Sequence, residues 1–413
     1  MAQITNRERS PGSSERGPFD PARFDPRSPE YAVQVANHLL RAAVAAGASD
    51  VHLQPTPAGI EVAYRIDGVL QPTGILASGE GTDPIARLKV MAGLLTYASG
   101  RPQEGRLQTA VENVEMRIST FPTIHGERTV IRLFGREAEL RRLDDLGLSR
   151  PVRETLAELL LEQDGAILVT GPAGSGKTTT LYAAARELIG ASSHRRAVLS
   201  IEDPVETVLS GASQSQLDPS TGMTLAAAVR SMLRQDPEVL LIGEIRDPET
   251  AEAALQASLT GHLVLTSFHA GDAAMALRRL VEMGVATYLI RSGVRAVLSQ
   301  RLLRRLCDCR RSVDPAVTGL AVSAAWEAVG CQRCFQTGYR GRVLASELLR
   351  LDSGAVAEAV AAPIDQHRSA DEIRTAAVGA GMQDLRHGVL ARVAAGETSP
   401  AEALRVLGSR ISP

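Results

Sequence analysis

The chain carries the stretch Gly171-Pro172-Ala173-Gly174-Ser175-Gly176-Lys177-Thr178. It follows the pattern G-x-x-x-x-G-K-[ST], in which glycines let backbone N–H groups close around a chain of phosphates. The preceding residues 166–170 are a short apolar run typical of a buried strand, and residues 179–188 have the pattern of a helix. Strand, glycine loop and helix together predict a phosphate-binding loop, with the positive end of the helix at the phosphates.

This loop assigns a role to two side chains. Lys177 is expected to reach the β- and γ-phosphates of a nucleotide, and the Thr178 hydroxyl to hold Mg²⁺. The alternative is an ordinary tight turn between strand and helix, which would have little use for the lysine. The predicted ATP-binding residues are Gly171, Pro172, Ala173, Gly174, Ser175, Gly176, Lys177, Thr178 and Thr179.

The residues after position 150 predict an α/β domain. Continuous rather than alternating hydrophobicity indicates strands covered on both faces, and therefore a parallel sheet in a series of βαβ units. We expect a nucleotide-binding domain over residues 150–300, then a cysteine module over 301–345 and a helical region over 346–413. The apolar runs that predict the strands are residues 167–169, 198–201, 239–242 and 263–266.

Carboxylates follow two of these predicted strands. Glu202, Asp203 and Glu206 come after residues 198–201, and Glu244 ends a run with the form of a Walker B motif. The carboxyl ends of parallel strands face the ligand crevice. Phosphoryl transfer to water needs one acid to hold Mg²⁺ and another to orient and deprotonate the water. We assign Mg²⁺ to Thr178 and Glu244, whereas a helix cap or a solvated loop charge is an equally good interpretation of Glu202.

Two histidines, His262 and His269, bracket the strand predicted at residues 263–267. A single histidine is more often structural than catalytic. Two histidines beside the sheet that carries the phosphate-binding loop predict instead a sensor of the γ-phosphate.

Length and composition restrict the class of protein. The chain has 413 residues, a net charge of −2 and 3% aromatic residues. That length favours two or three domains, and the charge argues against nucleic-acid binding through a general positive field. No apolar run approaches the ~18 residues that cross a bilayer, and the N-terminus lacks a secretory apolar region. We therefore expect a cytoplasmic protein whose membrane contact is only through partners.

The N-terminal third predicts a leader and a small domain. Residues 1–29 are rich in Pro, Arg, Ser and Asp, and predict a disordered leader because they bury too little apolar surface to repay ordering. Residues 30–135 are expected to form an α+β domain, followed by a charged linker at 136–149. Alternation predicts its strands at 59–66, 114–118 and 128–134, and a helical pattern covers residues 84–95.

The cysteines predict a metal site. A cytosolic chain does not usually keep structural disulfides, so two thiol pairs joined by a loop of 21 residues indicate structural zinc. The first pair is C-x-C, tighter than the usual C-x-x-C, and four reduced thiols in a small subdomain are the alternative. The four residues are Cys307, Cys309, Cys331 and Cys334.

Taken together, these motifs resemble the secretion ATPases of the type II secretion and type IV pilus assembly class. The resemblance covers roughly residues 35–410 in one order and is far more specific than a phosphate-binding loop alone. The matching stretches are residues 49–53, 64–70, 122–128, 169–181, 201–206, 234–247, 257–262, 300–302 and 337–342.

The resemblance implies a RecA-like P-loop ATPase domain with a parallel sheet, preceded by a small PAS-like α+β domain. It also implies a homo-hexameric ring whose two domains shift as ATP is bound and hydrolysed, and an inner-membrane platform protein as partner. By resemblance the catalytic glutamate is Glu206, the Walker B glutamate is Glu244, and the histidine box runs from His262 to His269.

The family's N-terminal domain supplies arginines to the nucleotide, and these correspond to Arg117 and Arg132. A guanidinium at the γ-phosphate stabilises the charge that spreads in the transition state. From the residues alone, both arginines are exposed strand residues.

Three features depart from the family pattern. Longer members carry an extra N-terminal domain that docks on a membrane partner, whereas only the predicted leader precedes the shared part here. The T-L-H-T of many relatives is Ser267-Phe268-His269-Ala270. The first cysteine pair is C-x-C. Four cysteines at this place favour the assembly and export branch, because the retraction branch typically lacks the module.

Other functions remain open. A conjugation-type (type IV secretion) traffic ATPase shares the ring but is expected to lack the cysteine module. A regulatory ATP-binding protein that hydrolyses little is disfavoured by Lys177, Glu206 and Glu244. A nucleic-acid motor is suggested by an arginine cluster, which we interpret instead as a basic helix face at a subunit or partner contact, because interleaved aromatics are missing. The cluster is Arg301, Arg304, Arg305, Arg310 and Arg311.

Overall fold

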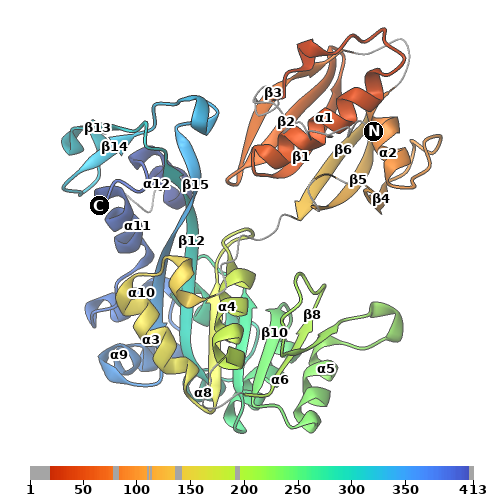
Figure 1. Cartoon of the computed structure of the whole chain (residues 1–413). Coiled ribbons are helices and arrows are strands. Elements are labelled where there is room, and N and C mark those ends of the chain that lie inside the picture. Colours follow the sequence, from red (N-terminus) through yellow and green to blue (C-terminus); the bar gives the residue numbers. More distant parts are fainter. Residues whose placement is uncertain are drawn as a thin grey trace, which may run out of the picture. The chain divides into compact units, whose positions relative to one another are not determined.

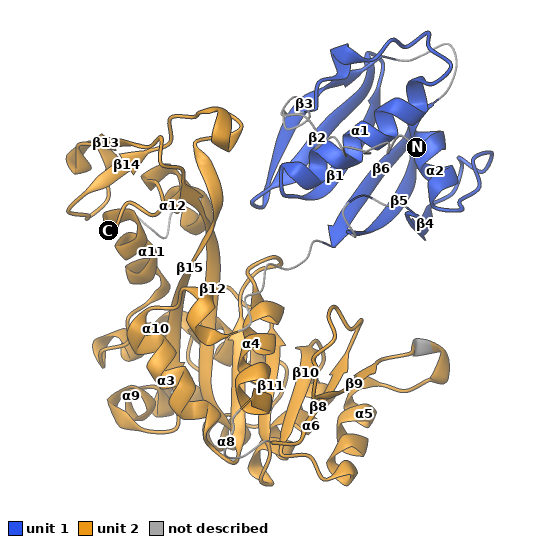
Figure 2. Cartoon of the chain, in the orientation of Figure 1, with its two compact units in different colours: residues 1–139 blue, residues 140–413 orange. Residues whose placement is uncertain are grey.

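The computed structural model describes residues 19–77, 83–108, 111, 114–134, 142–190 and 196–408. The chain divides into residues 1–139, here called unit 1, and residues 140–413, here called unit 2 (Figure 2). Among the helices in the described ranges, none combines the length and the apolar character that crossing a bilayer requires.

Unit 1 is a six-stranded antiparallel sheet in the order β3-β2-β1-β6-β5-β4 (Figure 1). Two helices, α1 (Tyr31–Ala45) and α2 (Pro84–Met91), share one hydrophobic core with the sheet. The strands are β1 (Ala48–Thr56), β2 (Gly59–Ile66), β3 (Val69–Leu76), β4 (Gln103–Arg106), β5 (Glu115–Thr123) and β6 (Gly126–Phe134).

The period-two pattern explains why only one face of this sheet is buried. On β2, Val62 and Tyr64 are each 1% exposed, whereas Glu61, which precedes Val62, is exposed on the opposite face. β2 has the bounds that alternation predicts, β6 contains the strand predicted at 128–134, and β5 contains the strand predicted at 114–118 except for its first residue. The sequence analysis predicted neither α1 nor β1.

The predicted helix over 84–95 is shorter in the structure. It begins as expected, with the Asp83 side chain accepting a hydrogen bond from the N–H of Ile85 and Pro84 in the first turn. It ends at Met91, and Gly93 then takes a φ of +67°, a left-handed conformation that suits glycine just beyond a helix.

Part of the predicted leader is packed in the structure. Phe19 is 2% exposed, its ring lies 5.8 Å from the ring of Phe24, and both rings contact His38 on α1. Two aromatic side chains therefore anchor residues 19–29 to α1. The composition of the leader had predicted disorder for this segment. Residues 1–18 lie outside the described ranges.

Residues 142–149 of the predicted linker are likewise packed, in this case on unit 2. Leu143 and Leu146 are buried in one cluster with side chains of α3 (Arg150–Leu160) and α4 (Lys177–Gly190). The rest of the linker up to residue 141 lies outside the described ranges.

Unit 2 is built on a seven-stranded sheet in the order β15-β12-β7-β11-β10-β8-β9. All neighbouring strands are parallel except β15, which runs antiparallel to β12 at one edge. The strands are β7 (Gly165–Thr170), β8 (Val198–Glu202), β9 (Ser213–Gln216), β10 (Val239–Ile245), β11 (Leu263–Phe268), β12 (Val294–Leu306) and β15 (Tyr339–Arg350).

Helices cover both faces of this sheet, which is why its strands are continuously apolar. α3 and α4 bury one face. The other face is buried by α5 (Leu225–Met232), α6 (Pro248–Leu259), α7 (Ala273–Glu282), α8 (Thr287–Gly293), α9 (Gly354–Asp365) and α10 (Ala370–Gly379).

The predicted strands and helix of the α/β domain are all present. The four apolar runs fall in β7, β8, β10 and β11, and the helix predicted at 179–188 lies within α4. The predicted fold class, an α/β domain preceded by a small sheet domain and followed by cysteines and helices, is confirmed.

The long strands β12 and β15 were not predicted, and they correct the interpretation of the basic cluster. Arg301, Arg304 and Arg305 lie on β12 and not on a helix. Arg304 donates to the buried carboxylate of Glu402 at 2.8 Å, and its guanidinium lies 3.9 Å from the ring centre of Tyr339. Arg304 thus packs on α12 (Pro400–Leu407), which follows α11 (Leu385–Ala394). In the cysteine loop, Arg310 lies 5.6 Å from the ring centre of Trp326, and Arg311 on β13 (Arg311–Val313) pairs with Glu327 on β14 (Ala325–Glu327).

Candidate active site

The glycine loop begins where β7 ends and closes where α4 begins. Gly174 and Gly176 take φ values of +72° and +88°, which other residues adopt only with strain. At Gly171 a Cβ atom would lie 2.5 Å from Ser175 Oγ and 2.6 Å from the Gln300 carbonyl oxygen. Glycine is therefore required here both by the backbone and by space.

Gln300 on β12 supports this loop, a role that the sequence analysis did not assign. Its side chain is fully buried; Nε2 donates to the Ser175 carbonyl oxygen at 2.8 Å, and Oε1 accepts from the Thr180 hydroxyl at 3.0 Å. The register pairs Ser299 with Thr170, so β12 delivers Gln300 to the start of the loop. The only signal in the sequence was its place in a stretch that resembles the family.

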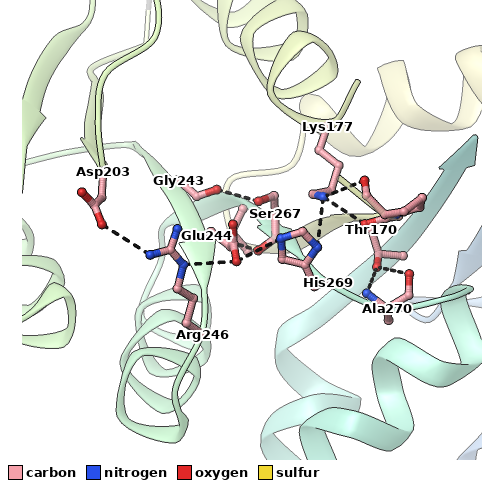
Figure 3. Close-up of polar contacts among 12 residues, drawn as sticks. Thr170, Lys177, Asp203, Gly243, Glu244, Arg246, Ser267, His269 and Ala270 are labelled. Carbon is pink, nitrogen blue, oxygen red and sulfur yellow. Dashed lines mark hydrogen bonds and ion pairs between the residues drawn. The ribbon is translucent and has the colours of Figure 1, made fainter. Parts of the chain in front are cut away.

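Lys177 is held by the loop itself. Its ammonium donates to the carbonyl oxygens of Gly171 at 2.9 Å and Pro172 at 3.2 Å, and it lies 3.4 Å from His269 Nδ1 (Figure 3). Burial lowers the pKa of Lys177, and the nearby Glu244 carboxylate opposes that effect. The acceptors of the ammonium are thus neutral, and a negatively charged phosphate can replace them.

Glu244 stands at the centre of a series of polar side chains in contact. Its Oε1 lies 3.2 Å from His269 Nε2 and 3.3 Å from Arg246 Nε, and Arg246 reaches Asp203 Oδ2 at 3.4 Å (Figure 3). Together with Lys177, these contacts connect the ends of β7, β8, β10 and β11. The structure therefore brings Lys177, Glu244 and His269 together, as the sequence predicted.

Two further bonds fix the same edge of the sheet. The Ser267 hydroxyl donates to the Gly243 carbonyl oxygen at 2.7 Å, and the Ala270 N–H donates to the Thr170 hydroxyl at 2.9 Å (Figure 3). These bonds connect the ends of neighbouring strands where each strand passes into its loop. The backbone that carries Lys177, Glu244 and His269 is therefore held in place.

The three acids at the end of β8 and in the loop after it have different environments. Glu202 is 4% exposed and accepts hydrogen bonds from the hydroxyls of Tyr182 and Ser200 and from the Gln214 amide. A carboxylate surrounded by donors is a structural group. Asp203 is exposed and pairs with Arg246, and Glu206 is exposed on the loop that follows.

His262 is not part of this group. It lies just before β11, and Leu263 at the start of β11 pairs with Gly165, at the end of β7 remote from the glycine loop. Six strand residues at about 3.3 Å each separate it from His269. Its Nδ1 lies 3.1 Å from the Ala257 carbonyl oxygen at the end of α6, where it completes a helix terminus.

Arg117 and Arg132 are cross-strand partners on β5 and β6 of unit 1. Their side chains are 57% and 66% exposed, and they pair with Glu115 at 3.5 Å and Asp50 at 3.1 Å. The Arg117 guanidinium also lies 4.8 Å from the ring centre of Phe134. Both arginines are thus held on the face of the sheet that faces away from the unit 1 core.

The four cysteines form a cluster in the loop between β12 and β15. Their sulfurs lie within 4.8 Å of one another, at 3.9 Å for Cys307–Cys331, 3.9 Å for Cys309–Cys334 and 3.7 Å for Cys331–Cys334. Four sulfurs at the corners of a tetrahedron around zinc, each ~2.3 Å from the ion, stand about 3.8 Å apart. The donor set fits one tetrahedral metal ion, and the C-x-C spacing does not prevent it.

Comparison with known proteins identifies the family. The pattern of the family described as "Type II/IV secretion system protein" matches residues 27–405. The type II secretion system protein HxcR of Pseudomonas aeruginosa is 43% identical over 377 residues, covering 91% of this chain and 77% of the relative. The type II secretion system ATPase E of Vibrio cholerae is 38% identical over 91% of this chain and 75% of its own.

The type IV pilus assembly ATPase PilB of Thermus thermophilus is 38% identical over 90% of this chain, which spans 42% of that longer protein. Solved structures share the fold. The ATPase DotB of Legionella pneumophila aligns with a TM-score of 0.65 at 21% identity, over 94% of this chain and 98% of its own. The pilus retraction motor PilT aligns with a TM-score of 0.57 at 24% identity, over 92% and 96%.

Proposed function

Because the chain belongs to the type II/IV secretion system protein family and is a homologue of type II secretion and type IV pilus assembly ATPases, we propose that it is a motor that hydrolyses ATP to drive assembly of a pilus or pseudopilus. The observation that carries this proposal is the contact chain from the glycine loop through Lys177 and His269 to Glu244. Through these contacts, a phosphate bound in the loop would affect Glu244, a carboxylate that is suited to bind a cation.

ATP would bind with its phosphates at the N–H groups of residues 174–178, and Lys177 would exchange two neutral carbonyl partners for the β- and γ-phosphates. A bound Mg²⁺ neutralises phosphate charge. Thr178 and Glu244 would hold it. When Lys177 moves, His269 loses one neighbour and keeps the other, Glu244, so the histidine reports the presence of the γ-phosphate.

Glu206 is the proposed general base. Glu202 is 4% exposed and accepts from three donors, whereas Glu206 is exposed on the loop after β8. A general base has to reach the attacking water. An exposed loop carboxylate can do so as the site closes around ATP, and a buried, saturated one cannot.

The working form is proposed to be a homo-hexamer. Arg117 and Arg132 are exposed on unit 1, and each pairs with a carboxylate that a more highly charged phosphate can displace. In a ring they would stabilise the γ-phosphate during its transfer. The ring would work at the cytoplasmic side of the inner membrane through a platform protein, without contact to nucleic acid.

The cysteine cluster is proposed to hold zinc. Its sulfur separations suit tetrahedral thiolate ligation. The ion would close the loop between β12 and β15 and stiffen the outer edge of the sheet. The cluster also favours the secretion and assembly branch over a conjugation-type ATPase, in which the module is not expected.

The test is a pair of matched variants, Glu206→Gln and Glu202→Gln. Loss of the general base should lower kcat by roughly 10²–10⁴-fold and leave binding of a fluorescent ATP analogue within about twofold of the wild type. Glu202→Gln should leave kcat of the folded protein close to wild type and lower the free energy of unfolding by about 1–3 kcal/mol, because it breaks a buried hydrogen-bond set. Unchanged kcat in Glu206→Gln would place the base elsewhere.

A further inference from the structure

A cavity of about 830 Å³ lies beside the glycine loop, on the side of α7 and α10. Its wall includes Gly171 and Pro172 at the start of the loop, residues 269–271 after β11, and Arg301 of β12. Ligand sites for small molecules have volumes of about 300–1,000 Å³. Of the predicted ATP-binding residues only Gly171 and Pro172 line it, and Lys177 does not, so the cavity adjoins the phosphate-binding space at the start of the loop.

The cavity is positively charged. Arg278 and Arg279 of α7 and Arg301 contribute three guanidinium groups, and Glu282 is the only acid among the lining residues that the structure describes. Glu282 accepts from Arg278 Nε at 2.8 Å. An excess of positive charge therefore remains at the wall.

Backbone carbonyl groups also hold the arginines in place. Arg279 donates to the His269 carbonyl oxygen at 2.6 Å, Arg278 to that of His367 at 2.5 Å, and Arg301 to that of Gly271. Each guanidinium has five N–H donors in a rigid fork, a geometry that matches phosphate oxygens. The arginines are thus oriented in advance, and Arg278 is also paired with Glu282.

We propose that this cavity is a second anion site, which binds a small ligand that carries a diphosphate group. The three arginines bind the diphosphate, and Met275 and Pro172 provide an apolar surface for the rest of the ligand. This site goes beyond the proposed motor function and does not require hydrolysis of ATP.

Ligand binding in this cavity would affect nucleotide binding, because the two sites share residues. Gly171 and Pro172 line the cavity and also hold the Lys177 ammonium. Arg279 holds the backbone of His269, whose ring contacts both Lys177 and Glu244. An anion that draws Arg279 away from that carbonyl therefore loosens the loop that carries the histidine.

The test is the binding of inorganic pyrophosphate to the full chain, measured by calorimetry. Wild-type protein should bind two per chain. Lys177→Ala, which weakens pyrophosphate binding at the glycine loop, should still bind one pyrophosphate per chain, with the affinity of the cavity unchanged. Adding Arg278→Ala should weaken that remaining site at least tenfold, and Arg278→Lys should give an intermediate loss because it keeps the charge without the fork.

The matched control is Arg291→Ala in the Lys177→Ala background. Arg291 is a half-exposed arginine on α8 that pairs with Asp365 and does not line the cavity; its loss should leave the affinity unchanged. The proposal is overturned if Lys177→Ala binds no pyrophosphate, or if the Arg278 and Arg291 variants weaken it equally. ATP hydrolysis is measured on wild-type protein from the same preparation. If the protein hydrolyses ATP, a negative result for the cavity does not count against the proposed motor function.

Competition in Lys177→Ala identifies the ligand class. Displacement of pyrophosphate by ADP or GDP assigns the site to nucleotides, and displacement only by inorganic phosphates assigns it to free phosphate compounds. Equal displacement by succinate at matched charge would contradict a site for diphosphates.

Discussion

At the scale of single residues, Gln300 shows how the glycine loop keeps its shape. It contacts the loop at Ser175 and the first turns of α4 at Thr180, and it is buried beneath both. The loop must present its N–H groups before the phosphates arrive, since ordering it on binding would cost affinity. Gln300 is therefore a positioning residue and not a catalytic one.

Gln300→Ala should raise KM for ATP about tenfold or more, the equivalent of one or two lost hydrogen bonds at about 1–1.5 kcal/mol each, with kcat changed less. Steady-state hydrolysis separates the two constants. Gln256→Ala, on the exposed side of α6 where its amide contacts only Glu252 among the described side chains, is the control and should leave both unchanged. A purely structural role for Gln300 would instead lower the active fraction and leave KM as it is.

The sequence predicted those site residues that follow directly from local patterns. Lys177 comes from the loop motif, and Glu244 and His269 from the ends of apolar runs. Gln300 could not be predicted in this way because its role depends on the pairing of β12 with β7, which are far apart along the chain. His262 was expected beside the γ-phosphate, but the direction of β11 puts it at the opposite edge of the sheet.

At the scale of elements, Glu347 links two helices to the edge of the sheet. It lies on β15, is 2% exposed, and accepts from the N–H groups of Ala273 and Leu385, each at 2.7 Å. These residues begin α7 and α11. Burial raises the pKa of Glu347 to about 7, although both backbone N–H groups act in the opposite direction.

This raised pKa predicts a pH dependence of stability. The folded state keeps the proton to about pH 7, whereas the unfolded chain loses it near its ordinary value of 4.5. Between those values the folded state binds more protons, so stability should fall as pH rises, by up to about 3 kcal/mol, and change no further above pH 7.

Urea unfolding from pH 5 to 8 measures this effect. Glu347→Gln carries no proton to lose and should flatten that part of the profile, whereas the exposed Glu252→Gln should retain it. Equal slopes in wild type and Glu347→Gln would refute the assignment.

The cysteine loop is a second element that can be tested. Elemental analysis should find about one zinc per chain, and Cys331→Ser, which removes one of four sulfur ligands, should lose it. Because the ion closes the loop between β12 and β15, the variant should also show faster hydrogen exchange in residues 307–338. A stably folded wild-type protein without metal would reject the zinc site.

Element boundaries were predictable only where the pattern is local. β2 and the buried strands of unit 2 follow from alternating or continuous apolar residues. β12 carries arginines, and β15 carries arginines and a glutamate; they become strands because they pair with each other and because β12 pairs with β7. The packing of Phe19 on α1 is likewise a non-local contact that composition conceals.

At the scale of the whole molecule, the chain joins two units that carry different parts of the proposed site. Unit 2 holds the glycine loop with its lysine, glutamate and histidine, and unit 1 presents Arg117 and Arg132. If a ring brings those arginines to the nucleotide, catalysis depends on assembly and not only on the folding of one chain.

The most direct test is the specific rate of ATP hydrolysis, with Mg²⁺ present, over a wide range of protein concentration, with the oligomeric state followed by sizing. The rate per chain should rise steeply over the range in which the hexamer forms, and Arg117→Ala should assemble normally but lack most of that rise. No hydrolysis at any concentration, for protein that is folded and hexameric, would contradict the proposal that this chain is an ATP-driven motor.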